Sequence, residues 1–291
     1  MQAPAHDDQL PHLLEKIYRD RALDYMGYRK TSLRRRIARR LRAHRIHSYS
    51  EYAAILDADP NEYQRLLDDL SINVSDFFRD REAFRVIDTC VLPELIRRKQ
   101  AERRLKIWSA GCASGEEPYS IGIMLNRHLG DRIADWDIRI YATDLHEGTL
   151  DKARLGVYDH AKLESLGEDV KRYFSMDGRC RITDRIRGLV RFGCHNLTSD
   201  PVISRVDLLL CRNVLIYFDR PLQKKVCLNL HWAISEGGFL FLGEAESLSI
   251  PIEGRFEVID KRWKIYRKIG TPEKTRHKGT EAQRHRGDHG G

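Results

Sequence analysis

Three features are missing from this sequence of 291 residues, and each absence narrows the class of protein. Its six cysteines include no Cys-x-x-Cys pair, which argues against a zinc site or a disulfide framework and favours a reducing compartment, the cytoplasm. No apolar run approaches the roughly 20 residues that span a bilayer, so no membrane insertion is expected. The first residues lack the basic and apolar segments of a signal peptide, and none is expected.

Positive charge is concentrated rather than spread. The formal net charge is +8, and nine Lys or Arg side chains lie from Arg29 to Arg45. Leu33, Ile37 and Leu41 recur every four residues in this stretch, which predicts a helix with one apolar stripe and arginines elsewhere. Such a helix is either a solvated surface or a docking site for an acidic partner, nucleic acid included. Residues 271–291 are basic without apolar periodicity, which predicts a disordered tail.

The distribution of apolar residues predicts two structured parts. Residues 1–85 predict a helical domain with a linker, and residues 86–270 predict alternating strands and helices, which is typical of a doubly wound α/β sheet. A polar segment at about 160–190 predicts an insertion with a helix and short strands. Helix breaks are expected near Gly27, Ser48 and Pro60. The predicted strands are 105–110, 137–143, 189–193, 206–211, 238–242 and an antiparallel hairpin of 256–259 with 263–267, and the predicted helices are 119–129, 147–155 and 221–235.

The stretch 105–119, LKIWSAGCASGEEPY, carries the strongest functional signal. A predicted strand runs into a turn of small residues that includes Gly111, and a predicted helix follows, which is the order that builds a nucleotide-type pocket at the edge of a parallel sheet. Glu116 and Glu117 stand where phosphate-binding loops have bare N–H groups or a lysine, and two glutamates repel a phosphate. A nucleoside with a sulfonium and an ammonium group, S-adenosylmethionine, fits better. The alternative is an ordinary turn before a helix.

Polar residues at the ends of other predicted strands extend this pocket. Asp144 ends the second strand, where a carboxylate accepts hydrogen bonds from ribose hydroxyls, although a helix N-cap is an equal alternative. Arg212 and Asn213 follow the most apolar strand, at the edge where open sheets place their ligands. Asn196 and Leu197 follow another strand and would either reach the adenine of a nucleoside or form a plain polar loop.

Five spaced motifs, in this order, carry a resemblance to a known family. They are NVSDFFRD (73–80), WSAGCASGEEPYSI (108–121), ATDLHEGTLDKAR (142–154), CRNVLIYF (211–218) and GGFLFLGEAESL (237–248). The first of them places two adjacent aromatic residues between the two predicted parts, which suits an interdomain anchor as well as a ligand contact. Together with the basic helical segment, the chain resembles the chemotaxis-receptor glutamate methyltransferases of the CheR type over about residues 10–269.

This resemblance implies a fold and a reaction. The fold is a Rossmann-like class I methyltransferase sheet with an antiparallel terminal hairpin and a small β-subdomain insertion, preceded by an all-helical domain. The reaction moves a methyl group from S-adenosylmethionine to glutamate side chains of chemoreceptors, gives a glutamate methyl ester and S-adenosylhomocysteine, and serves adaptation in chemotaxis. No metal is implied. A glutamate carboxylate, with a pKa of about 4.3, is the nucleophile at neutral pH and needs no general base.

The resemblance also carries roles onto individual residues. Arg79 or Tyr217 would orient the acceptor carboxylate, and Glu117, or its neighbour Glu116, would face the methionine moiety or its ammonium group. The implied cofactor-binding residues are Asn73, Ser75, Arg79, Gly111, Glu117, Asp144, Asn196, Leu197, Arg212 and Asn213. The arginines implied to dock the substrate are Arg34, Arg35, Arg36, Arg39, Arg40 and Arg42.

The implied partner is the cytoplasmic, glutamate-rich helical methylation region of chemoreceptors, which a basic helix complements in charge. Tethering by a receptor C-terminal peptide is not expected, because the longer glycine-containing loop of peptide-binding relatives is not evident in 176–192. A monomer that binds no nucleic acid is expected. Two alternatives stay open: a non-catalytic S-adenosylmethionine-binding sensor or scaffold, and a methyltransferase for another acceptor such as nucleic acid, although no Asn/Asp-Pro-Pro-aromatic tetrapeptide is present.

Overall fold

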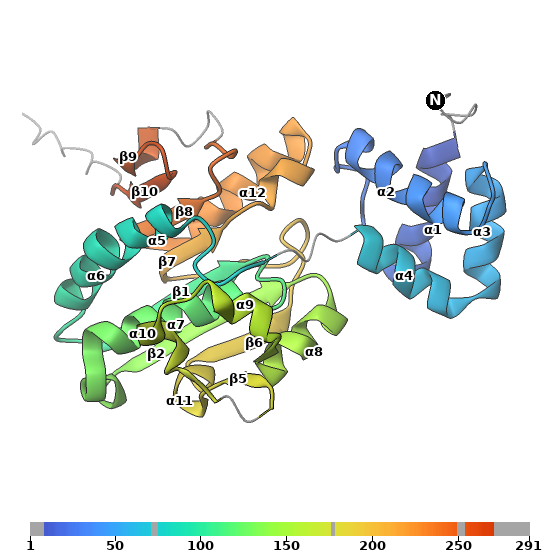
Figure 1. Ribbon diagram of the computed structural model, residues 1–291. Helices are drawn as coiled ribbons and strands as arrows, with labels where there is room; N and C mark the ends of the chain where they lie inside the picture. The colour runs from blue at the N-terminus through green and yellow to red at the C-terminus, as the bar shows by residue number, and fades with distance from the viewer. Residues whose placement is uncertain (1–8, 71–74, 176–177, 249–253, 271–291) are drawn as a thin grey trace, which may run out of the picture.

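A helical N-terminal domain lies beside a larger α/β domain in the computed structural model of the protein (Figure 1). The structure describes residues 9–70, 75–175, 178–248 and 254–270. Asn73 and the basic tail that begins at residue 271 therefore lie outside the described residues. None of the helices within these ranges is both long and apolar enough to cross a membrane.

The helices within residues 9–70 pack around one apolar core. The predicted stripe of Leu33, Ile37 and Leu41 is buried there, with exposed fractions of 4% or less. The Ser48 Oγ accepts a hydrogen bond from the Glu51 N–H at 3.2 Å and caps the third helix. The helices are α1 (Leu10–Arg21), α2 (Lys30–Ala43), α3 (Tyr49–Ala58) and α4 (Pro60–Leu70), so the breaks predicted near Gly27, Ser48 and Pro60 are confirmed.

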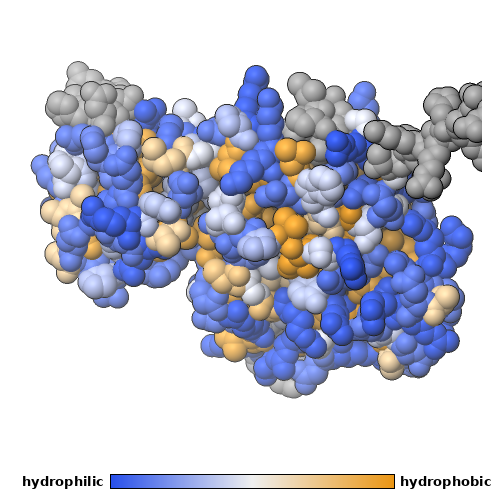
Figure 2. Space-filling view, turned by 180° about the vertical axis from the view of Figure 1, so that it is seen from behind, coloured by the Kyte–Doolittle hydropathy of each residue, from blue (hydrophilic) through white to orange (hydrophobic). Residues whose placement is uncertain are grey.

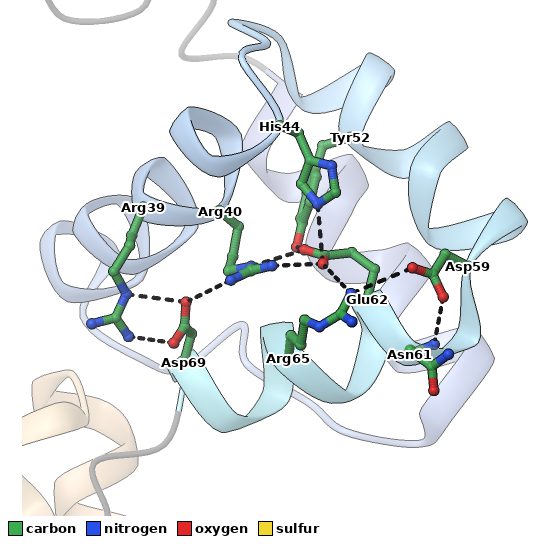
Figure 3. A network of polar contacts seen from close by, with 9 residues as sticks. All are labelled: Arg39, Arg40, His44, Tyr52, Asp59, Asn61, Glu62, Arg65 and Asp69. Carbon is green, nitrogen blue, oxygen red and sulfur yellow. Dashed lines mark hydrogen bonds and ion pairs between the residues drawn. The ribbon is translucent and has the colours of Figure 1, made fainter.

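A wholly buried carboxylate, Glu62 on α4, links three of these helices (Figure 3). Its two oxygens accept hydrogen bonds from the Arg40 guanidinium at 2.8 and 2.6 Å, and the Tyr52 hydroxyl donates another at 2.7 Å. The His44 Nε2 lies 3.0 Å from the same carboxylate. Burial alone raises a carboxyl pKa, but the hydrogen bonds from Arg40, Tyr52 and His44 outweigh it and lower the pKa of Glu62 to about 2.

Seven of the described strands of the α/β domain form its main sheet, in the order β6-β2-β1-β7-β8-β10-β9. The first five strands in this order are parallel, and β10 and β9 add an antiparallel hairpin at the edge. This confirms the predicted fold class. The bounds are β1 (Arg104–Ala110), β2 (Asp137–Asp144), β6 (Val190–Cys194), β7 (Val206–Cys211), β8 (Ile234–Leu242), β9 (Phe256–Asp260) and β10 (Ile265–Lys268).

Both faces of the sheet are covered, so its central strands are apolar on both sides. Along β7, Leu208 and Leu210 face one hydrophobic cluster, and Leu209 and Cys211 face the other. The first cluster includes side chains of α5 (Arg81–Val86), the π-helical turn η2 (Ile87–Val91), α6 (Leu92–Arg98), α7 (Glu116–Leu129) and α8 (Glu147–Leu155). The second includes side chains of α12 (Arg220–Ala233). Seen from behind, the surface of the molecule is mostly hydrophilic, with apolar atoms gathered on the larger domain (Figure 2).

Several predicted boundaries differ from those observed by one to four residues, and three of the differences have a structural explanation. Helix α7 begins at Glu116 rather than at 119. Pro118 can lie in its first turn because the N–H groups of a first turn have no partner within the helix, so the missing N–H of proline costs nothing there. Helix α12 ends at Ala233, and β8 begins directly at Ile234, which has extended backbone angles and pairs with Val206 of β7. The predicted end of the helical domain at residue 85 falls inside the continuous segment formed by α5, η2 and α6.

The segment between α8 and β6 forms a small subdomain. This subdomain corresponds to the insertion predicted at about 160–190, but its first strand, β3, begins earlier, at Val157. It holds a three-stranded antiparallel sheet in the order β3-β5-β4. Phe77 from the interdomain linker packs edge-on against Tyr158 and Phe174, with ring centroids 4.8 and 5.2 Å apart. The elements are β3 (Val157–Tyr158), α9 (His160–Glu164), α10 (Glu168–Lys171), β4 (Phe174–Ser175), β5 (Cys180–Ile182) and α11 (Asp184–Arg187).

The two domains meet through backbone hydrogen bonds. The turn between α1 and α2 pairs with the segment before α12, where Tyr28 and Phe218 form an antiparallel bridge. The Arg29 N–H donates to the Tyr217 carbonyl at 2.8 Å, and the Asp219 N–H donates to the Gly27 carbonyl at 2.9 Å. The rings of Tyr28 and Phe218 also pack edge-on at 5.0 Å. The N-terminal domain is thereby fixed next to the carboxyl edge of the sheet.

Replacing Glu62 by Gln is expected to destabilise the protein by about 3 kcal/mol, because the half-buried Arg40 loses its bidentate charge partner and, of the described carboxylates, keeps only Asp69, 3.7 Å away. The charge of Glu62 contributes fully to the free energy of unfolding above pH 4.5, its ordinary pKa, and this contribution is lost as the pH falls toward 2. The difference in the free energy of unfolding between variant and wild type should therefore shrink across that interval. Urea unfolding at pH 7 and at pH 3 measures both effects. Arg39→Gln removes only an exposed pair with Asp69 and should cost less than about 1 kcal/mol; an equal loss in both variants would contradict the assignment.

Candidate functional site

The chain reverses its direction of travel across the sheet between β1 and β7. From β1 it proceeds outward to β2 and β6, and it then returns to build β7 and β8 on the other side of β1. The loops that leave β1 and β7 diverge at this switch point, which is where open parallel sheets bind ligands. A pocket lies there, and the N-terminal domain contributes part of its wall. The lining residues include Ser75, Arg79, Gly111, Cys112, Ala113, Glu117, Asp144, Asn196, Leu197, Arg212, Asn213 and Tyr217, with Tyr25, Tyr28, Leu33 and Arg36 from the N-terminal domain.

The turn after β1 requires glycine for two reasons. Gly111 has a φ of +77°, which favours glycine, and a Cβ at this position would lie 2.4 Å from the Cγ2 of Val214. The N–H groups of Gly111 and Cys112 both donate to the Thr143 carbonyl of β2, at 2.7 and 2.9 Å. The turn is therefore held against the end of β2 and the loop after β7, and it forms the floor of the pocket.

The two adjacent glutamates of this segment point to different places. Glu116 is wholly buried and bonds away from the pocket, where the Ser114 Oγ donates to it and the Lys162 ammonium pairs with it. Glu117 lines the pocket, accepts a hydrogen bond from the Ser109 Oγ at 2.7 Å, and lies 3.4 Å from the Arg212 guanidinium. Burial raises the pKa of Glu117, and the nearby Arg212 opposes that shift. Of the two alternatives, Glu117 is the one that a ligand in this pocket would meet.

Asp144 stands at the end of β2 with both carboxylate oxygens engaged by the backbone. The Ala113 N–H donates to one oxygen at 3.0 Å, and the His146 N–H donates to the other at 3.1 Å. The residue at the N-cap of α8 is His146, so Asp144 does not cap that helix. Each carboxylate oxygen has a second lone pair, and Asp144 lines the pocket with that capacity left for a ligand hydroxyl.

Arg212 and Asn213 leave the buried end of β7. The Arg212 side chain is 2% exposed and stacks on the ring of Phe241 at 4.4 Å. Asn213 has a φ of +60°, a conformation that asparagine tolerates, and its N–H donates to the carboxylate of Glu246 at 2.9 Å. Glu246 also accepts from the Gly243 N–H at 2.7 Å. Burial raises the pKa of Glu246, and these backbone hydrogen bonds oppose the shift.

Glu246 is a site residue that the sequence interpretation missed. It holds the loop after β7 by accepting from the Asn213 and Ile216 N–H groups, and it also accepts from the Gly243 N–H directly after β8. The available signal was an acidic residue shortly after the apolar strand 238–242, at the edge of the sheet where polar residues gather.

The loop after β6 forms the far wall of the pocket. The Asn196 Oδ1 accepts from the Thr198 N–H at 2.9 Å and from its hydroxyl at 2.7 Å, which makes a tight local turn. This turn brings Asn196 and Leu197 to the pocket surface. His195 packs edge-on against Trp108 of β1, with ring centroids 5.3 Å apart, and ties the loop to the centre of the sheet.

Arg79 and Tyr217 both line the pocket, although they lie 138 residues apart in the sequence. Arg79 lies in the linker between Phe78 and Asp80, which both have left-handed backbone angles with φ of +53° and +63°. The Arg36 guanidinium lies over the Tyr217 ring, 5.2 Å from its centroid. Burial raises the pKa of Tyr217, while Arg36 opposes that shift, so the phenol keeps its proton at neutral pH.

The arginine helix presents only part of its predicted surface. Arg35, Arg39 and Arg42 are exposed, whereas Arg34 is half-buried. Arg40 turns inward to Glu62, and Arg36 is buried, where it donates to the Leu70 carbonyl and lines the pocket. The expected docking surface therefore loses Arg36 and Arg40, because both lie on the side of α2 that packs against α4.

The site residues have the hydrogen-bond acceptors that an S-adenosyl ligand requires. A largely buried carboxylate, Glu117, suits an ammonium group, and a second carboxylate, Asp144, suits vicinal hydroxyls. Nothing in the turn after β1 provides the lysine of a phosphate-binding loop. The apolar side chain of Leu197 and the edge of His195 supply a surface against which a flat base would pack.

Comparison with known proteins assigns the chain to a family. Over 242 residues it is 35% identical to a protein named chemotaxis protein methyltransferase 2 from Pseudomonas aeruginosa, covering 80% of this chain and 84% of that protein. It is 33% identical to a chemotaxis protein methyltransferase from Listeria innocua, covering 81% and 89%. A 104.1 kDa protein from Rhodobacter capsulatus is 30% identical, and the match spans only 28% of its length.

Two family models match in succession and between them account for nearly all of the described residues. The first is the CheR methyltransferase all-alpha domain, at residues 8–71, and the second is the CheR methyltransferase S-adenosylmethionine-binding domain, at residues 73–265. They meet in the linker, directly before the segment that carries Arg79 to the pocket. The chain thus belongs to the CheR methyltransferase family.

Proposed function

We propose that this protein is a cytoplasmic protein-glutamate O-methyltransferase that uses S-adenosylmethionine and acts on the helical methylation region of chemoreceptors. The observation that carries the proposal is one pocket lined by the carboxylates Glu117 and Asp144, by Arg79 and by Tyr217, beside the arginine-rich helix α2. The relatives named chemotaxis protein methyltransferase support the choice of acceptor.

The cofactor roles follow from the chemistry of each side chain. Glu117 takes the ammonium group of the methionine moiety, since it is a buried carboxylate with a lone pair facing the pocket. Asp144 accepts hydrogen bonds from the ribose hydroxyls, and Asn196 and Leu197 border the adenine. Gly111 and Asn213 shape the floor. The linker contributes Ser75 and, outside the described residues, Asn73.

The transfer step needs orientation rather than proton transfer. Bound S-adenosylmethionine supplies a methyl group on a positively charged sulfur. The acceptor glutamate is already ionised at neutral pH, so the protein has to hold one carboxylate oxygen in line with that methyl group. Arg79 orients the carboxylate through a charge-assisted hydrogen bond, and the protonated Tyr217 hydroxyl donates a second one. Neither side chain changes its protonation state.

Docking of the acceptor follows from charge. The exposed arginines of α2, Arg35, Arg39 and Arg42, recur at intervals of four and three residues and so share one face of the helix. A glutamate-rich receptor helix is complementary to this face, which lies beside the pocket because Leu33 and Arg36 of the same helix line it.

Incubation with radiolabelled S-adenosylmethionine and a chemoreceptor cytoplasmic fragment, followed by mild alkali, tests the reaction. The expected result is protein-bound label that alkali releases as volatile methanol, the product of a carboxyl methyl ester. Arg79→Ala should slow the transfer by about tenfold or more, as expected for the loss of a charge-assisted hydrogen bond. Label that resists alkali would assign another acceptor group, and cofactor binding without any labelling would favour a sensor.

The adjacent glutamates provide a matched pair of variants. Glu117→Gln should weaken S-adenosylhomocysteine binding about tenfold or more, because a charged hydrogen bond contributes about 1.5–3 kcal/mol. Glu116→Gln should mainly lower stability, since Glu116 pairs with Lys162 outside the pocket. Calorimetric titration and thermal unfolding of both variants measure the difference. Equal effects on binding would refute the assignment of Glu117.

Reversal of charge on α2 tests the docking surface. The double variant Arg35→Glu with Arg42→Glu should raise the KM for the receptor fragment about tenfold or more, lose most of the salt dependence, and leave the affinity for S-adenosylhomocysteine unchanged. The double variant Arg97→Glu with Arg132→Glu, at two exposed positions of the α/β domain, is the charge-matched control. Equal responses of the two variants would exclude docking on α2.

A further inference from the structure

The Arg212 guanidinium is shared unequally between two carboxylates. Its Nη2 lies 2.5 Å from the Asp80 Oδ2, whereas its Nη1 lies 3.4 Å from the Glu117 Oε2. The first distance is that of a strong charge-assisted hydrogen bond, and the second is at the limit of any hydrogen bond. Glu117 is thus a largely buried pocket carboxylate whose cationic neighbour Arg212 is directed mainly at Asp80.

The position of this guanidinium is otherwise restricted. The Arg212 side chain is 2% exposed and stacks on Phe241 and Phe84, 4.4 and 5.3 Å from the ring centroids. Its Nε has no hydrogen-bond partner among the described residues. The rings fix the plane of the guanidinium, and three acceptors direct its Nη groups: the carboxylates of Asp80 and Glu117 and the Arg79 carbonyl.

Asp80 is held in an unfavourable backbone conformation to make this contact. Its φ is +63°, and that of Phe78, two residues earlier, is +53°. Left-handed angles at such residues cost free energy and persist where the surroundings enforce them. Two hydrogen bonds do so here: the Phe78 N–H donates to the Ser120 Oγ at 3.0 Å, and the Arg212 Nη2 donates to the Arg79 carbonyl at 3.1 Å. Arg212 therefore holds the backbone of Arg79 while it pairs with Asp80.

We propose that Asp80 is a positioning residue that keeps Arg212 off Glu117, so that the Glu117 carboxylate remains available for the ammonium group of the cofactor. Without the charge of Asp80, the guanidinium turns toward Glu117, closes the 3.4 Å gap and competes with the ligand. The same turn releases the Arg79 carbonyl. The effect on Glu117 requires only that the pocket binds S-adenosylmethionine. The effect on Arg79 rests on the proposed function, in which Arg79 orients the acceptor.

Asp80→Asn isolates the charge, because asparagine has nearly the same shape and tolerates the left-handed backbone. Calorimetric titration with S-adenosylhomocysteine should show affinity weaker by about five- to tenfold, within the range of coupling between contacting residues. In a Glu117→Gln background the same change should alter affinity by less than about twofold, since nothing remains for Arg212 to compete for. S-adenosylhomocysteine has no sulfonium, so repulsion between a positively charged ligand sulfur and Arg212 does not contribute to the expected loss of affinity.

Glu82→Gln is the matched control, because Glu82 lies two residues away, is exposed and pairs only with Arg85 among the described contacts. Thermal unfolding of every variant checks that each is folded at the temperature of titration. An unchanged affinity of Asp80→Asn, or the same loss with and without Glu117, would overturn the proposal. Neither readout involves an acceptor, so a failure of methyl transfer to receptors would refute the proposed function and leave this inference standing.

Discussion

A carboxylate that leaves water has to find a cation or several hydrogen-bond donors, and this constraint links distant parts of the chain. Glu116 finds Lys162 in the small subdomain, and Glu117 finds the Ser109 hydroxyl of β1 at 2.7 Å, with Arg212 farther away at 3.4 Å. In the N-terminal domain, Glu62 finds Arg40 on another helix. Each pair joins two elements that the hydrophobic core alone would not hold in a fixed relation. The shape of the pocket follows from where these partners lie.

The pocket also depends on the contact between the domains. Tyr217 belongs to the α/β domain, yet its backbone bonds to Arg29 and its ring lies under Arg36, both from the N-terminal domain. A substrate that approached the isolated α/β domain would meet a site with one wall missing. The pocket is therefore built by both domains together, and α2 contributes Leu33 and Arg36 to its wall.

Much of the fold could be predicted from the sequence, because the buried parallel strands are short apolar runs that end in polar residues. The strand 206–211 and the helix 147–155 have the predicted bounds. The site was harder to predict where a side chain's direction depends on a remote partner. Glu116 and Glu117 look alike in sequence. Glu116 points away from the pocket because it pairs with Lys162, which lies 46 residues later in the chain. Arg40 looked like a surface residue because Glu62 lies on another helix. Asp80 and Glu246 act through contacts that no local spacing reveals.

The joint between the domains is made largely by main-chain atoms, with Gly27 packed so closely that a Cβ there would lie 2.8 Å from Leu222. Main-chain bonds do not specify which side chains flank them. The two domains can thus diverge in sequence at different rates and remain docked, provided that position 27 stays small. The helical domain can therefore change in sequence without altering the pocket residues of the α/β domain, which an interface built from side chains would not allow.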